Sequence, residues 1–193
     1  MSIQNDAHVV VLLADYVGID AAGKINALGA GFGIAPLQPT GLTAPMHVIV
    51  IVDVPAKHSG QQYALSLELR DETTGQAVTI PAAPSGALEP LRIQQVVTVL
   101  TPQIAGLHLP AGSIPSRTQL PVAFQDGLPL QAGHTYLWKV QIDQQGRPSW
   151  VARFHVPGTP PNPVFGGPVG PASIPNIQPP ALPLDENGDD LQP

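Results

Sequence analysis

The sequence predicts an all-β fold, an antiparallel β-sandwich of the immunoglobulin-like or fibronectin-like type, followed by an extended proline-rich C-terminal arm. Three observations predict it. Short runs rich in β-branched residues recur up to residue 156, a tyrosine lies at the spacing of a tyrosine corner, and the composition changes after Pro157. We therefore expect a sandwich domain over residues 1–156 and an arm with an acidic end over residues 157–193.

Strands are expected wherever β-branched or alternating runs are bounded by turn residues. Residues 46–54 (MHVIVIVDV) are apolar almost throughout, which predicts a central strand or one buried on both faces. Residues 63–71 alternate, with Leu65, Leu67 and Leu69 on one face. The other expected strands cover residues 8–14, 25–35, 76–80, 91–100, 119–125, 134–143 and 150–156.

Local signals refine this order. Residues 18–23 are expected to form a turn, and Glu72–Gly75 a turn that makes residues 76–80 the hairpin partner of 63–71. Pro121 predicts an edge position or a bulge. The last two strands are expected to form a hairpin across residues 144–148.

The sharpest local signal is the segment that leads into residue 136. Leu130 and Gly133 precede Tyr136 by six and three residues, the spacing of a tyrosine corner, in which the phenol bonds back to the main chain. Trp138, Val140 and Ile142 should share the core face with Tyr136. This signal concerns structure and implies no chemistry.

The arm is the main candidate for partner binding. Eleven of the last 37 residues are proline, so the segment should be extended or polyproline-like. Apolar residues along such a segment suit a groove on this subunit or on a neighbour, although a loosely attached tail is the alternative. The predicted partner-binding residues are Val164, Phe165, Val169, Ile174, Ile177, Leu182 and Leu184.

Charge and composition exclude several classes of function. Charged residues make up 11% of the chain, and no basic stripe is available for phosphate contacts, so nucleic-acid binding is not expected. No apolar run reaches the roughly 18 residues of a membrane span, and we expect no targeting segment because residues 9–14 lack basic residues before them. The absence of cysteine excludes disulfides, thiolate metal sites and cysteine nucleophiles.

No catalytic residue, cofactor site or metal site is predicted. Gly29, Gly31 and Gly33 lack the spacing and the following helix of a phosphate-binding loop, and are interpreted as small residues of a strand. There is no G-x-S-x-G elbow, and the six histidines are dispersed, so each is expected at the surface or at a strand edge. Four carboxylates fall in or beside expected strands, with turn or salt-bridge explanations: Asp15, Asp53, Glu68 and Asp143. The acidic segment 185–190 departs from a calcium loop, because its glycine comes too early and no helices flank it.

Two segments carry a resemblance to known proteins. The sequences LLADY (residues 12–16) and GKINALGAGF (residues 23–32) resemble a family of uncharacterised β-sandwich proteins of bacteria, especially actinobacteria, and their phages. Residues 67–72 and 133–143 are similar too, so the resemblance spans about residues 8–156 and leaves the arm outside. It implies a sandwich fold and a bacterial or phage origin, but no activity.

These observations favour a non-enzymatic structural or interaction protein. We expect an accessory or decoration subunit of a phage virion, in the capsid or the tail, that docks through its arm onto capsid or tail subunits, onto itself, or both, and therefore an oligomer or assembly component. The alternative is a cytoplasmic bacterial β-sandwich that binds a protein or small ligand through loops such as residues 36–45 or 101–116. An enzyme of unrecognised type ranks below both.

Overall fold

The computed structural model describes residues 2–82, 84–100, 110 and 113–158, and these form an all-β structure with antiparallel sheets. The predicted fold class is therefore confirmed for the sandwich. Residues 159–193, with all seven predicted partner-binding residues of the arm, lie outside the described residues.

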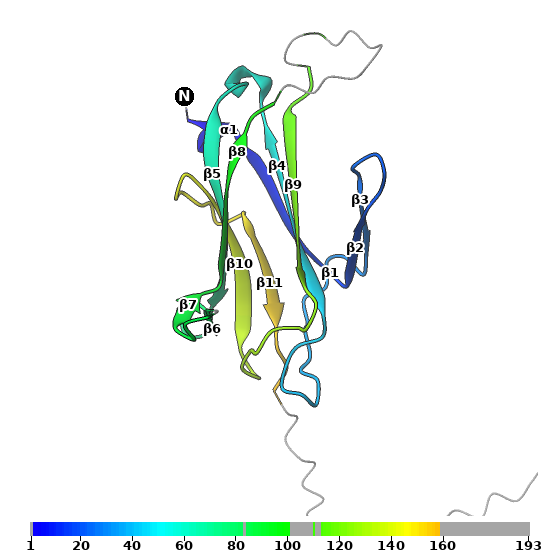
Figure 1. Ribbon diagram of the computed structural model, residues 1–193, viewed down its shortest axis with the longest axis vertical. Helices are drawn as coiled ribbons and strands as arrows, with labels where there is room; N and C mark the ends of the chain where they lie inside the picture. Colours follow the sequence, from blue (N-terminus) through cyan, green and yellow to red (C-terminus); the bar gives the residue numbers. More distant parts are fainter. Residues whose placement is uncertain (1, 83, 101–109, 111–112, 159–193) are drawn as a thin grey trace, which may run out of the picture. The chain divides into compact units, whose positions relative to one another are not determined.

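Two sheets make up the sandwich (Figure 1). The smaller sheet has the order β1-β4-β9, and the larger has the order β11-β10-β5-β8. Their strands are β1 (His8–Ala14), β4 (Met46–Val54), β9 (Ser116–Phe124), β5 (Gln62–Asp71), β8 (Arg92–Thr98), β10 (Thr135–Ile142) and β11 (Val151–His155). In a constant-type immunoglobulin domain the strand at the place of β8 pairs in the opposite sheet. Because β8 pairs with β5 instead, the order is of the fibronectin-like kind.

Four short strands and two short helical turns complete the fold. β2 (Tyr16–Ile19) pairs with β3 (Ile25–Leu28), and β6 (Thr79–Pro81) pairs with β7 (Leu88–Pro90), each as a separate two-stranded sheet. The β2–β3 hairpin stands away from both main sheets (Figure 1). α1 (Ile3–Asp6) precedes β1, and the 3-10 turn η1 (Ala56–His58) follows β4.

The core lies between the two main sheets, where the sequence places it. β4 is central in its sheet and almost wholly buried, as its uninterrupted apolar run predicts. The side chain of Trp138 is completely buried and stacks on Phe124 of the opposite sheet, with 5.1 Å between ring centroids. The predicted core face of β10 is confirmed, because Tyr136, Val140 and Ile142 are buried with Trp138.

The tyrosine corner is also confirmed. The Tyr136 hydroxyl oxygen accepts a hydrogen bond from the main-chain N–H of Gln131 at 2.8 Å. Leu130 is buried beneath the corner, and Gly133 has φ of +83°, a left-handed conformation that glycine adopts without strain. The corner thus fixes the entry of the chain into β10.

The edge prediction for Pro121 is confirmed. Pro121 lies in β9, at the edge of the three-stranded sheet, opposite Ile49 of β4. Such an edge tolerates proline when the missing N–H would face away from the neighbouring strand.

The expected strand over residues 25–35 is wrong beyond Leu28. Gly29 and Gly31 have φ of +62° and +88°, so they are turn residues and not small residues of a strand. The main-chain N–H of Gly31 instead donates to the Leu13 carbonyl at 2.7 Å. The expected turn over residues 18–23 begins later, at Asp20, because Gly18 and Ile19 belong to β2.

The expected pairing of residues 76–80 with β5 holds only at its start. Ala77 forms an isolated bridge with Arg70, and the Val78 N–H donates to the Leu69 carbonyl at 3.0 Å. From Thr79 onward the chain pairs with β7 instead. Leu91 takes the place beside Leu69, donating to Val78 and accepting from Leu69, so the ladder of β5 continues with β8.

Candidate interaction surfaces

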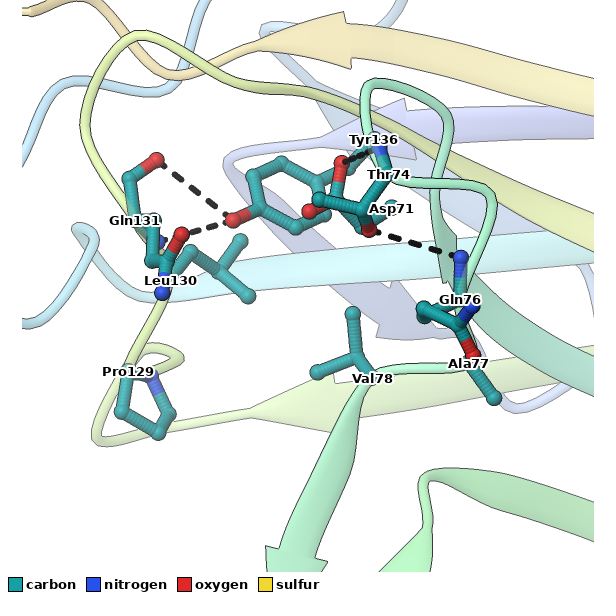
Figure 2. A pocket seen from close by; sticks show the side chains of 9 residues that line it. All are labelled: Asp71, Thr74, Gln76, Ala77, Val78, Pro129, Leu130, Gln131 and Tyr136. Atoms are coloured by element: carbon teal, nitrogen blue, oxygen red, sulfur yellow. Dashed lines mark hydrogen bonds between the residues drawn. The ribbon is translucent and has the colours of Figure 1, made fainter.

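A pocket of about 260 Å³ opens beside the tyrosine corner, between the turn after β5 and the loop before β10 (Figure 2). Figure 2 shows the Tyr136 ring lying between Gln131 on one side and Asp71 with Thr74 on the other. The pocket is lined by Asp71, Thr74, Gln76, Ala77, Val78, Pro129, Leu130, Gln131 and Tyr136.

The acidic group of this pocket is engaged by its own surroundings. One Asp71 carboxylate oxygen accepts from the main-chain N–H groups of Thr73 and Thr74 at 2.9 and 3.3 Å, and the other lies 2.8 Å from Nδ1 of His134. Burial acts to raise the pKa of Asp71, but the bonds from His134 and Thr74 outweigh it and hold the pKa below its usual value.

The polar group of Tyr136 is likewise already hydrogen-bonded within the protein. Its hydroxyl is taken up by Gln131, and burial raises the pKa of the phenol, which keeps it neutral. The polar groups of the pocket therefore hold the turn and the corner in place. They do not present an activated nucleophile among the residues that line it.

A second, more apolar hollow adjoins the first and shares Pro129 with it. It has a volume of about 530 Å³ and lies between the start of the β6–β7 hairpin and the turn after β9. Apolar side chains dominate its wall: Ile80, Pro81, Leu91, Ala123, Phe124, Leu128 and Pro129, with Gln125 and Asp126 at its polar side. The second hollow, which we call the apolar groove beside Pro129, is suited to an extended chain or a small apolar ligand.

The β2–β3 hairpin carries three of the exposed large apolar side chains of the described residues. Tyr16, Ile19 and Leu28 are 57%, 60% and 67% exposed, and we call these three residues the hairpin surface. Tyr16 and Leu28 are direct cross-strand partners, so both lie on one face, while Ile19 and Ile25 form a pair on the other. An isolated two-stranded hairpin is marginally stable in water. Exposed apolar groups on both of its faces favour a covering partner.

Most ion pairs of the described residues join two side chains. Asp53 and Arg117 make a bidentate ion pair at 2.8 Å, and Asp143 accepts from the Ala64 N–H, so the structural interpretation of these carboxylates is confirmed. The described residues contain no group of three or more histidine, aspartate or glutamate side chains that could hold a metal ion. Within the same residues, no helix has the length and apolar character needed to cross a membrane.

The surface prediction for the histidines is wrong for His58 and His47, which are buried. His58 lies 2.8 Å from Asp6 through Nε2 and 3.1 Å from the Gln61 side-chain oxygen through Nδ1, which ties α1 to η1. Lys57 bonds the same carboxylate, and these two side chains hold the pKa of Asp6 below its usual value. No short sequence motif predicts this contact, because His58 and Asp6 are 52 residues apart in the sequence.

Sequence reasoning missed the hairpin surface. Apolar residues on each side of the tight turn at Asp20–Gly23 are a signal for it, but the turn expected over residues 18–23 begins two residues too early. The binding loop expected at residues 101–116 lies largely outside the described residues. The arm also lies outside them from residue 159 onward.

No protein-family model matches this sequence, and no curated protein is significantly similar to it.

Proposed function

We propose that this protein is a non-enzymatic assembly protein, an accessory or decoration subunit of a phage virion that docks through its C-terminal arm. The observation that carries the proposal is the hairpin surface. A hairpin with exposed apolar side chains on both faces is stabilised when a protein partner buries those side chains. The low charge of the chain and the apolar residues of its proline-rich arm support the same interpretation.

The virion proposal also draws on the sequence resemblance to actinobacterial and phage proteins. A role in a virion explains why the chain combines a sandwich with an extended arm, since such an arm adds contact area without a second core. Capsid subunits, tail subunits and further copies of this chain are the proposed partners. No cofactor enters this function.

Mass spectrometry of density-gradient-purified particles from the source strain tests the proposal. We expect the full chain to co-purify with particles, and expect association to be lost when the seven apolar arm residues are replaced by serine. The matched control replaces Asp185, Glu186, Asp189 and Asp190 by their amides, which removes charge from the arm but keeps its apolar residues. Particles that retain the serine variant at the wild-type level would argue against arm docking.

A second experiment addresses the hairpin surface separately. The triple variant Tyr16→Ser, Ile19→Ser and Leu28→Ser should weaken particle association at least tenfold, while Lys24→Ser at the tip of the same hairpin should not. Circular dichroism of each variant checks that the sandwich remains folded.

The apolar groove beside Pro129 favours one alternative, a cytoplasmic bacterial β-sandwich that binds a protein or a small ligand. This alternative predicts that the protein stays in the cytosolic fraction and is missing from purified particles. It also predicts that Ile80→Asp, in the wall of the groove, weakens ligand binding while the hairpin variant does not.

A further inference from the structure

The two main sheets have four outer edges, and in the described part of the chain three of them carry a main-chain contact or a proline that interrupts further pairing. On β1, the Leu13 carbonyl accepts from the Gly31 N–H at 2.7 Å. On β11, His155 bonds to both Gly33 and Ala35, at 2.8 and 2.9 Å. β9 carries Pro121, which cannot donate to a further strand. Natural sheets protect their edges in these ways against unwanted pairing.

β8 is the exception. Its seven residues (RIQQVVT) contain no proline, and no described residue pairs with the edge that faces away from β5. Val96 is 71% exposed on the outer face of the strand. An unprotected edge of this length with an exposed β-branched residue is suited to pairing with another strand.

Hydrogen bonds on either side of β8 show which of its main-chain groups face the free edge. The Val99 N–H donates to the Gln61 carbonyl, and the Leu91 carbonyl accepts from the Leu69 N–H. Odd-numbered residues therefore face β5, because main-chain groups alternate along a strand. The N–H and C=O groups of the even-numbered residues point outward: Arg92, Gln94, Val96 and Thr98.

We propose that β8 pairs antiparallel with β8 of a second copy of this chain, across a two-fold axis at Gln95, and joins the two four-stranded sheets into one. This inference builds on the proposed assembly role by naming a partner and a surface. In this register Arg92 lies opposite Thr98 and Gln94 opposite Val96, so every outward main-chain group is used.

The side chains of the edge favour a second copy over other occupants. Arg92 is the only charged residue of β8, and the two-fold axis places the two copies of Arg92 at opposite ends of the ladder. The interface thus brings no like charges together, and such two-fold interfaces are the commonest in soluble oligomers. The arm of this chain suits the edge poorly, because proline lacks the N–H that a ladder needs. Its one long proline-free stretch, residues 184–192, is acidic and has low β propensity.

Light scattering after size exclusion, on the full chain over a range of concentrations, gives the first test. The wild type should have twice the mass of one chain. Val96→Pro removes an outward N–H and spares the ladder with β5, so it should weaken dimerisation at least tenfold. The control Val96→Thr keeps the N–H and should remain dimeric. Thermal unfolding of both variants checks that the sandwich survives.

Cysteine cross-linking tests the register, since the chain has no cysteine of its own. Gln95→Cys would face its own copy in a non-hydrogen-bonded pair, about 4.5 Å apart between Cα atoms, within the range of a disulfide. It should form a disulfide-linked dimer under mild oxidation. Thr98→Cys would lie about 20 Å from its copy and should remain uncross-linked.

Several results would overturn the inference. The first is a wild-type protein that remains monomeric at high concentration. The second is a dimer whose stability is unchanged by Val96→Pro, because a surface other than β8 would then form the interface. A dimer abolished by the serine variant of the arm but kept by Val96→Pro would assign the contact to the arm. A β8 dimer that is missing from virions would instead refute the proposed function and leave this inference standing.

Discussion

The hydroxyl oxygen of Tyr136 lies 2.8 Å from the main-chain nitrogen of Gln131, and this bond closes the end of the sandwich. The phenol ring also stacks on Phe154 of β11, with 5.7 Å between ring centroids. One side chain therefore connects the loop before β10 to the hairpin that follows.

Tyr136→Phe should lower the free energy of unfolding by about 1–2 kcal/mol, because the Gln131 N–H loses its partner beside a buried ring. Urea denaturation measures the loss. Tyr63→Phe is the matched control: Tyr63 is as buried, but its hydroxyl makes a longer bond, 3.3 Å to Thr118, so the loss should be about 0.5 kcal/mol. Equal falls in the free energy of unfolding of the two variants would contradict a stabilising role of the Tyr136–Gln131 bond.

Gly127→Ala should destabilise the sandwich by about 3 kcal/mol. Gly127 has φ of +75°, and a Cβ there would collide with the main-chain carbonyl of Thr43. Thr43 is buried, and its hydroxyl accepts from the Leu128 N–H at 2.9 Å, so it has little room to move.

Gly133→Ala provides the comparison for this variant. Its φ of +83° is similar, but a Cβ would meet no atom within 4 Å. It should cost about 1 kcal/mol, the strain of a left-handed residue alone. If the two alanine variants unfold at the same urea concentration, the close approach of Thr43 contributes nothing.

Asp53 should make stability depend on pH in the acid range. The bidentate bond from Arg117 holds the pKa of this carboxyl below its usual value of 3.8. A group whose pKa is depressed on folding stabilises the protein above its unfolded pKa, and that contribution is lost as the pH falls through the folded value. The free energy of unfolding of the wild type should therefore fall below about pH 4.

Asp53→Asn should show a smaller fall over this range, and the two curves should converge at low pH. Arg117→Gln should have the same flattening effect, because it removes the cause of the shift. A wild-type curve parallel to that of Asp53→Asn at every pH would contradict the assignment. The magnitude should be small, since Arg117 is largely exposed and its ion pair is screened.

His58→Phe should loosen the N-terminal helix. The variant leaves Asp6 without its bond from the buried imidazole, so the free energy of unfolding should fall. Hydrogen exchange of residues 3–7 should accelerate more than that of the core strands. Lys57→Ala removes an exposed partner of the same carboxylate and should lower the free energy of unfolding less than His58→Phe does. Unchanged exchange at residues 3–7 in His58→Phe would show that α1 is held by other contacts, such as Arg147 on the carbonyls of Gln4 and Asn5.

Short-range pattern was enough for much of the fold. β4 coincides with the expected strand, because a nine-residue apolar run this rich in valine and isoleucine favours a buried strand over a helix. The tyrosine corner is predictable because its partners lie within six residues of one another. The hairpin of β10 and β11 followed from alternation on both sides of a short turn.

The candidate surfaces were much less accessible from the sequence. The sequence predicts Gly29 and Gly31 as strand residues, because a glycine gives no sign of whether its φ is positive in the fold. The hairpin surface depends on β2 and β3 leaving the main sheets, a choice made by packing. The groove beside Pro129 joins segments from β6, β9 and the loop before β10.

The sequence by itself determined that this protein is an antiparallel sandwich, which residues of β5 and β10 face the core, and where the chain turns into β10. Alternation and local spacing decide these features within a few residues. Only the tertiary structure decided that β6 pairs with β7, that His58 is buried against Asp6, and that no described residue pairs with the outer edge of β8. Those outcomes depend on which distant segment packs beside each strand. The alternation of side chains along a strand is the same for every possible pairing partner, so it cannot identify that partner.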